Sequence, residues 1–152
     1  MNKDIHKGGC LCGHVRYKTY GRSELTGVCH CRYCQLRTGS AFATLIYFPF
    51  ERFEITSGDL RRHEFLSESE KRWQTNFCEK CGSTVFIELE IFEGLIGVEA
   101  GTFYPPTFWF DVSNEVFIRS KAHFVGDIVT INKDDTFFSY EPKNGENPRL
   151  SS

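Results

Sequence analysis

Short apolar segments run along the chain, and most of them predict β-strands. Residues 15–19 alternate between β-favouring and basic side chains, which is the pattern of a half-buried strand. Residues 41–48 form a continuous run of β-branched and aromatic side chains, which is typical of a central strand. Residues 61–66 and 71–77 flank a polar turn, so we expect them to pair with each other.

Three more segments extend this pattern. Residues 84–89 alternate, and residues 95–100 and 115–119 are further strand candidates. A long amphipathic helical pattern is absent from the sequence, and residues 32–38 are expected to form one short helical turn. The fifteen Phe, six Tyr and two Trp favour a sheet interior. We therefore predict a mainly β fold, a small twisted barrel or sandwich of short strands with little helix.

The organisation predicted from the sequence is one domain followed by a tail. Residues 1–142 contain neither a repeat nor a linker and are expected to form a single domain. Residues 143–152 are rich in Asn, Gly and Pro and are expected to be a loose C-terminal end.

The charge balance and the apolar content limit the partners. The chain has 18 basic and 20 acidic residues, a formal charge of −2, which argues against a nucleic-acid partner. Its longest apolar stretch, residues 41–50, is too short to span a bilayer, so no membrane partner is expected. The first residues lack the apolar segment of a secretory signal, and we expect a soluble, cytoplasmic protein.

The seven cysteines are the strongest chemical signal in the sequence. They lie in tight clusters, and their number is odd, which fits a disulfide framework poorly. Clustered thiols in a chain without a secretory signal are more typical of a metal site. We therefore expect the cysteines to bind metal.

Two short motifs suggest one closed zinc site. In Cys78-Glu-Lys-Cys81-Gly82, two thiolates three residues apart can bind one tetrahedral zinc ion, and the glycine permits a tight turn. Cys10-Leu-Cys12-Gly13 is the nearest matching half. Together they predict a structural site with four thiolate ligands.

The third cluster, Cys29-His30-Cys31-Arg32-Tyr33-Cys34, has one ligand too few for a closed site. Because catalytic zinc sites keep one position for water or substrate, three cysteines predict an open site. Two alternatives remain. A histidine fills the fourth position (His30, or the distant His6, His14, His63 or His123), or residues 31 and 34 pair with 78 and 81 instead.

The order and the flanks of these motifs resemble the glutathione-dependent formaldehyde-activating enzyme family, also called the centromere protein V/Gfa domain. The matching segments are residues 9–17, residues 29–34, Gly39-Ser40-Ala41-Phe42 and residues 77–83. The resemblance implies a zinc-containing twisted barrel with two zinc ions per chain. It implies that Cys10, Cys12, Cys78 and Cys81 bind the structural zinc, and that Cys29, Cys31 and Cys34 bind the catalytic zinc.

The resemblance also implies a carbon–sulfur lyase reaction, the reversible condensation of formaldehyde with glutathione to S-(hydroxymethyl)glutathione. Ser40 is a candidate hydrogen-bond donor to the substrate. Arg32, Gln35 and Arg37 are candidate glutathione contacts, since arginine can hold a carboxylate with two hydrogen bonds. The alternative is a non-catalytic binding module whose second zinc site is closed.

Overall fold

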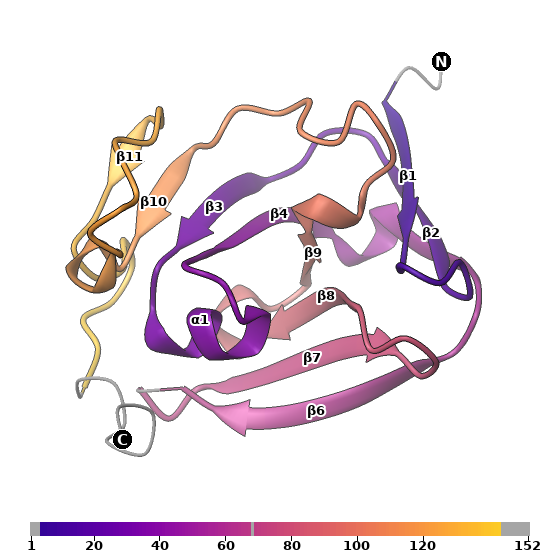
Figure 1. Ribbon diagram of the computed structural model, residues 1–152, viewed down its shortest axis with the longest axis horizontal. Helices are drawn as coiled ribbons and strands as arrows, with labels where there is room; N and C mark the ends of the chain where they lie inside the picture. Colours follow the sequence, from indigo (N-terminus) through magenta and orange to yellow (C-terminus); the bar gives the residue numbers. More distant parts are fainter. Residues whose placement is uncertain (1–3, 68, 144–152) are drawn as a thin grey trace.

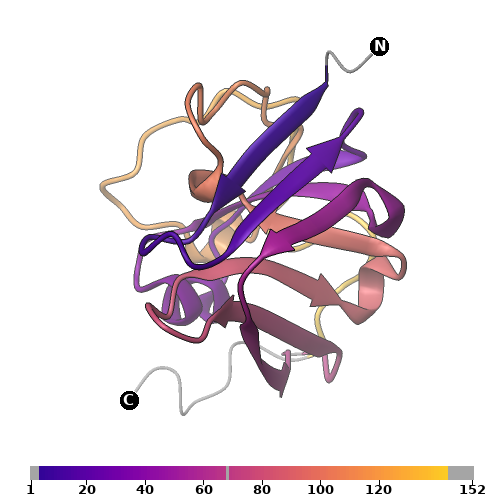
Figure 2. The same cartoon turned by 90° about the vertical axis from the view of Figure 1, so that its right-hand side faces the viewer.

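The strands form two open sheets whose side chains meet in one core. The computed structural model describes residues 4–67 and 69–143, and in that part of the chain the fold is mainly β, with α1 (Arg32–Thr38) as its one α-helix. Figure 1 shows α1 beside the larger sheet, and Figure 2 shows the smaller sheet in front of the larger one. The predicted fold class is thus confirmed, as two packed sheets that are not closed into a barrel.

The smaller sheet has the order β1-β2-β5 and is antiparallel throughout. Its strands are β1 (Ile5–Gly9), β2 (Arg16–Tyr20) and β5 (Phe53–Ser57). The turn between β1 and β2 contains Cys10 and Cys12, so the register of this hairpin fixes the first cysteine motif.

The larger sheet has the order β11-β10-β3-β4-β9-β8-β7-β6. In the part of the sheet with the order β3-β4-β9-β8-β7-β6, each strand is antiparallel to its neighbours. At the other edge, β10 runs parallel to both β3 and β11. The strands are β3 (Leu25–Cys29), β4 (Ala43–Pro49), β6 (Leu60–Leu66), β7 (Arg72–Cys78), β8 (Thr84–Leu89), β9 (Leu95–Glu99), β10 (Asn114–Val116) and β11 (Asn132–Lys133). Short 3-10 turns are η1 (Phe50–Arg52), η2 (Glu90–Phe92), η3 (Ala100–Thr102) and η4 (Ile118–Ser120).

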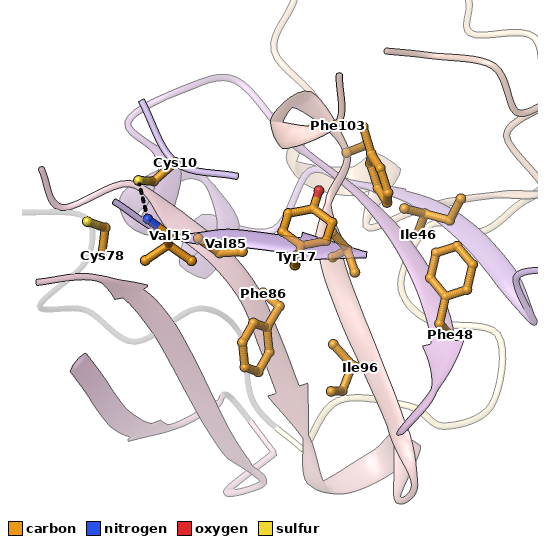
Figure 3. Packing of buried hydrophobic residues seen from close by; sticks show 12 residues of the cluster. Cys10, Val15, Tyr17, Ile46, Phe48, Cys78, Val85, Phe86, Ile96 and Phe103 are labelled. Atoms are coloured by element: carbon orange, nitrogen blue, oxygen red, sulfur yellow. Dashed lines mark hydrogen bonds between the residues drawn. The ribbon is translucent and has the colours of Figure 1, made fainter. Parts of the chain in front are cut away.

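Tyr17 lies at the centre of the core between the two sheets (Figure 3). Its ring contacts Phe53 of β5 and Phe103, and its hydroxyl lies 2.7 Å from Thr102 Oγ1. Phe48 of β4 and Val85 of β8 belong to the same buried cluster. Removing apolar surface from water stabilises the folded state by roughly 25 cal/mol per Å². The burial of these side chains therefore holds the β1–β2 turn against the larger sheet.

A second buried cluster lies around the other cysteines. It joins Tyr33 and Cys34 of α1 to Tyr47 of β4 and Trp73 of β7. The ring of Phe65 stacks on Tyr33 and also contacts Trp73, so β6 closes this end of the core.

Most predicted strands are present, and four others were missed. The pairing of residues 61–66 with 71–77 is confirmed by β6 and β7, and the short helix at 32–38 is confirmed by α1. The strands β1, β3, β5 and β11 were missed. The candidate at 115–119 continues only to Val116, after which Phe117 adopts a positive φ of 56°.

The predicted tail, residues 143–152, lies outside the described residues except for Lys143. The backbone amide of Lys143 donates a hydrogen bond to Ser69 Oγ at 3.2 Å. In the described part of the chain, the α-helix is much shorter than a membrane span requires.

Candidate metal centres

The four cysteines of the first two motifs meet where two turns face each other. The Sγ atoms of Cys10, Cys12, Cys78 and Cys81 all lie within 4.8 Å of one another. The Cys12 sulfur is 3.6 Å from that of Cys10 and 3.8 Å from that of Cys78. The structure thus brings together the set that the sequence assigned to one closed site.

Backbone amides surround these sulfurs in the manner expected for thiolates. The amide of Val15 donates to Cys10 Sγ at 3.2 Å (Figure 3), and the amides of Lys80 and Cys81 donate to Cys78 Sγ at 3.3 and 3.5 Å. The turns can present their amides inward because Gly13 and Gly82 have φ values of +90° and +78°. Four converging sulfurs with amide donors fit a tetrahedral zinc ion.

The other three cysteines come from one short segment between β3 and α1. Their Sγ atoms also lie within 4.8 Å of one another, and all three side chains are buried. Cys29 ends β3, Cys31 caps α1 by accepting the amide of Cys34 at 3.4 Å, and Cys34 lies in the first turn of α1.

Charge considerations also favour a cation in this cluster. Hydrogen bonds to Cys31 and Cys34, and then burial, raise the pKa of Cys29 well above its ordinary value. Hydrogen bonds from Cys29 and Cys31 hold the pKa of Cys34 well below its ordinary value. Three buried thiols therefore share protons, and a metal ion would replace those protons.

His30 points to a carboxylate that the sequence reasoning did not single out. Its Nε2 lies 2.8 Å from Glu115 Oε2, and both side chains have no exposed surface. Lys121 Nζ and Lys133 Nζ donate to the same carboxylate at 3.0 and 2.9 Å. Burial alone would raise the pKa of Glu115, but the hydrogen bonds from Lys133, Lys121 and His30 outweigh it and lower the pKa to about 2.

Among the described residues, the ligand atoms that converge at this second centre are three sulfurs. His14 instead belongs to a separate group with Asp59 and Glu79, and His6 stacks on Trp109 with ring centroids 3.6 Å apart. Residues 31 and 34 do not join 78 and 81. Of the alternatives, the geometry therefore matches the open, three-cysteine set.

A cavity of about 40 Å³ that opens to solvent on one side adjoins the three cysteines. Aromatic side chains form a large part of its wall: Tyr47, Trp73, Phe92, Phe117, Phe137, Phe138 and Tyr140. The sequence reasoning did not assign this wall. The clustering of aromatic residues at 137–140 is a sequence signal that points to it.

Of the predicted substrate contacts, Arg37 lies against the cysteine cluster but does not line the cavity. Arg37 forms an ion pair with Glu99, and its Nη2 is 3.9 Å from Cys34 Sγ. Arg32, Gln35 and Ser40 line a different, surface groove. Gln35 Nε2 donates to the carbonyls of His30 and Ser120 at 3.0 and 3.1 Å, so it braces the cysteine loop.

The chain is similar to known proteins in two comparisons. A crystal structure of a Rhodobacter sphaeroides protein is similar over 63% of this chain and 85% of that chain, with 21% sequence identity and a TM-score of 0.49. A family model described as "Glutathione-dependent formaldehyde-activating enzyme" matches residues 5–120, which include all seven cysteines and most of both sheets. The chain therefore belongs to the glutathione-dependent formaldehyde-activating enzyme family.

Proposed function

We propose that the protein is a zinc-dependent enzyme of the carbon–sulfur lyase type. It adds a small thiol, such as glutathione, to formaldehyde or a related electrophile, and it catalyses the reverse release. The observation that carries the proposal is the set of three buried cysteine sulfurs that lie against a cavity.

In this proposal Cys29, Cys31 and Cys34 hold the catalytic zinc, which when bound would supply a position where a substrate thiol loses its proton. The fit rests on the donor set, because three buried, neighbouring thiols need a cation to ionise together. Family membership supports the same assignment.

The reaction balances without an oxidant or a reductant. The thiol sulfur forms a bond to the carbonyl carbon, the π electrons of the carbonyl move to its oxygen, and the proton lost by the thiol ends on that oxygen. The buried wall of Tyr47, Trp73 and Phe117 keeps bulk water from the sulfurs, which strengthens electrostatic interactions there. The amide of Cys34 and the side chain of Gln35 keep the cysteine loop in place.

We assign Cys10, Cys12, Cys78 and Cys81 to a structural zinc. This ion would join the β1–β2 turn to the β7–β8 turn, and so couple the two sheets at one end. All seven cysteines are free of disulfide bonds, as a reducing, cytoplasmic compartment would keep them.

The test combines a metal count with a rate. We expect two zinc ions per wild-type chain and one in Cys31→Ser, which should fold but lose the thiol-dependent rate above the uncatalysed condensation. As a control, Ser40→Ala changes an exposed position in the surface groove and should keep both ions. A Cys31→Ser protein with full activity would refute the assignment.

Cobalt substitution separates the enzyme from the alternative of a non-catalytic binding module. An open site should change its visible absorption when glutathione is added, because a thiolate replaces a weaker ligand. A spectrum that thiols leave unchanged would favour a closed second site and a binding function.

A further inference from the structure

The cavity beside Cys29, Cys31 and Cys34 has walls that are suited to an uncharged ligand. Among the described residues, its lining contains cysteines, aliphatic and aromatic side chains, Gly27 and Asn114, and it contains none of the charged side chains. An unpaired carboxylate or ammonium group buried there would lose its hydration without gaining a partner, which is strongly unfavourable.

Three cationic side chains near the cluster pair with carboxylates. Arg37 pairs with Glu99, and both side chains are largely buried. Lys121 and Lys133 both donate to Glu115. To use one of these three side chains as its counter-charge, a peptide thiol with ionised ends would have to compete with the carboxylate that the side chain already contacts.

The free space is also small. At about 40 Å³ it holds only a few heavy atoms, whereas an apolar cavity of roughly 150 Å³ is the size that accepts benzene. The ring centroids of Phe137 lie 5.8 Å from Phe92 and 4.3 Å from Phe138, so this aromatic layer narrows the space over the sulfurs.

We propose that the thiol bound at this site is a short-chain, uncharged alkanethiol, in preference to a charged peptide thiol. This inference rests on the proposed function, because it names the substrate class of the same site. Its alkyl group occupies the apolar space, and its sulfur lies at the three cysteines. Addition to an aldehyde then gives an uncharged hydroxyalkyl thioether, with the same electron balance as above.

Binding can be measured without turnover. Of the two tryptophans, Trp73 lines the cavity and Trp109 packs against His6. The zinc-loaded Trp109→Phe protein therefore reports on the cavity through Trp73 emission, and calorimetry gives the affinities. The probes are ethanethiol, the anionic 3-mercaptopropionate, glutathione and the bulkier benzyl mercaptan.

We expect ethanethiol to bind at least tenfold more tightly than each of the other three probes. Equal or tighter binding of 3-mercaptopropionate or glutathione would overturn the inference, and so would tighter binding of benzyl mercaptan. Absence of a calorimetric signal with ethanethiol would overturn it as well.

A pair of substitutions isolates the effect of charge. Phe138 lines the cavity and is 43% exposed, so Phe138→Arg places a cation at the rim without opening the core. It should shift the ratio of the two affinities at least fivefold in favour of 3-mercaptopropionate over ethanethiol. The matched control, Val129→Arg, adds the same charge at a position that is 92% exposed and should change neither affinity. An equal gain in both variants would mean that overall charge, and not the cavity, selects the thiol.

The proposed function is judged separately by the metal count and by the dependence of the rate on Cys31. Rapid turnover of glutathione that requires Cys31 would keep the proposed function and refute this inference. Tight ethanethiol binding without any thiol-dependent turnover would refute the proposed function while the preference of the cavity stands.

Discussion

His30 and Glu115 meet at 2.8 Å with both side chains fully buried, and this contact joins the three-cysteine loop to β10. The backbone reinforces the same connection, because the amide of His30 donates to the carbonyl of Val116 at 3.1 Å. Lys121 and Lys133 complete the environment of the carboxylate. The position of two candidate zinc ligands, Cys29 and Cys31, therefore depends on residues that lie about a hundred positions further along the chain.

Substitution of Glu115 by glutamine should destabilise the protein. The change leaves His30 and two lysines facing a neutral amide, and breaking a buried ionic network of this kind costs about 3 kcal/mol. The free energy of unfolding, from urea denaturation, measures the effect. Glu93→Gln, at an exposed turn position, is the control and should stay within about 0.5 kcal/mol of wild type.

The contribution of Glu115 should also depend on pH in a defined direction. The folded pKa is lowered to about 2, and the unfolded value is about 4.3. A carboxyl group with a lowered pKa stabilises the fold above its unfolded pKa, and the stabilisation is lost as the pH falls toward the folded pKa.

The difference in unfolding free energy between wild type and Glu115→Gln should therefore be constant from pH 7 to about 5 and shrink between about 4.3 and 2. Because Glu115 braces the three-cysteine loop, bound metal is counted for both proteins at each pH, which separates metal release from the titration of Glu115. A difference that stays constant down to pH 3 would contradict the assignment.

The proposed structural zinc predicts an effect that a chelator removes. Cys12 is the exposed member of its cluster, so Cys12→Ser changes little apolar packing. We expect the variant to bind one zinc ion fewer and to melt at a lower temperature, because metal binding contributes directly to folding. In excess chelator the two proteins should melt together. A lower melting temperature that persists in chelator would point to packing rather than to metal.

The turn between β5 and β6 should not tolerate a side chain at Gly58. This residue has a φ of +88°, and a Cβ atom there would lie 2.2 Å from the carbonyl oxygen of His14. Gly58→Ala should cost about 2 kcal/mol or more, measured by urea denaturation. Gly101→Ala is the matched control, because a Cβ at that position meets nothing within 4 Å. Equal effects of the two substitutions would contradict the steric argument.

Local patterns were sufficient to predict part of the fold. The pairing of residues 61–66 with 71–77 could be predicted because a polar turn connects the two segments. The end of the short helix is marked in the sequence by Gly39, which forms the C-terminal cap with a φ of +66°. The strands β1 and β3 were missed because glycines weaken their pattern, two in β1 and Gly27 in β3. These segments become strands through pairing with neighbouring strands, because their own residues have a weak preference for strand structure.

The candidate site likewise has residues that the sequence predicted and residues that only the structure revealed. Cysteine spacing predicted both sets of sulfurs, because metal ligands in a tight turn are close in sequence. Glu115 gave no comparable signal, since a single acidic residue in a short strand becomes important only when Lys121 and Lys133 fold over it. The aromatic wall at Phe137 and Phe138 was missed for the same reason, since its role depends on distant partners such as Phe92.

The two sets of sulfurs differ in how much chain each one needs. A chain that leaves the ribosome completes the three-sulfur set as soon as Cys34 has been added, whereas the four-sulfur set must wait for Cys81. The loop that closes the first set is only a few residues long, so the entropy lost on closing it is small. The three-sulfur set is therefore ready for metal earlier in synthesis, and it stays without its aromatic cover until Phe137 and Phe138 have been added.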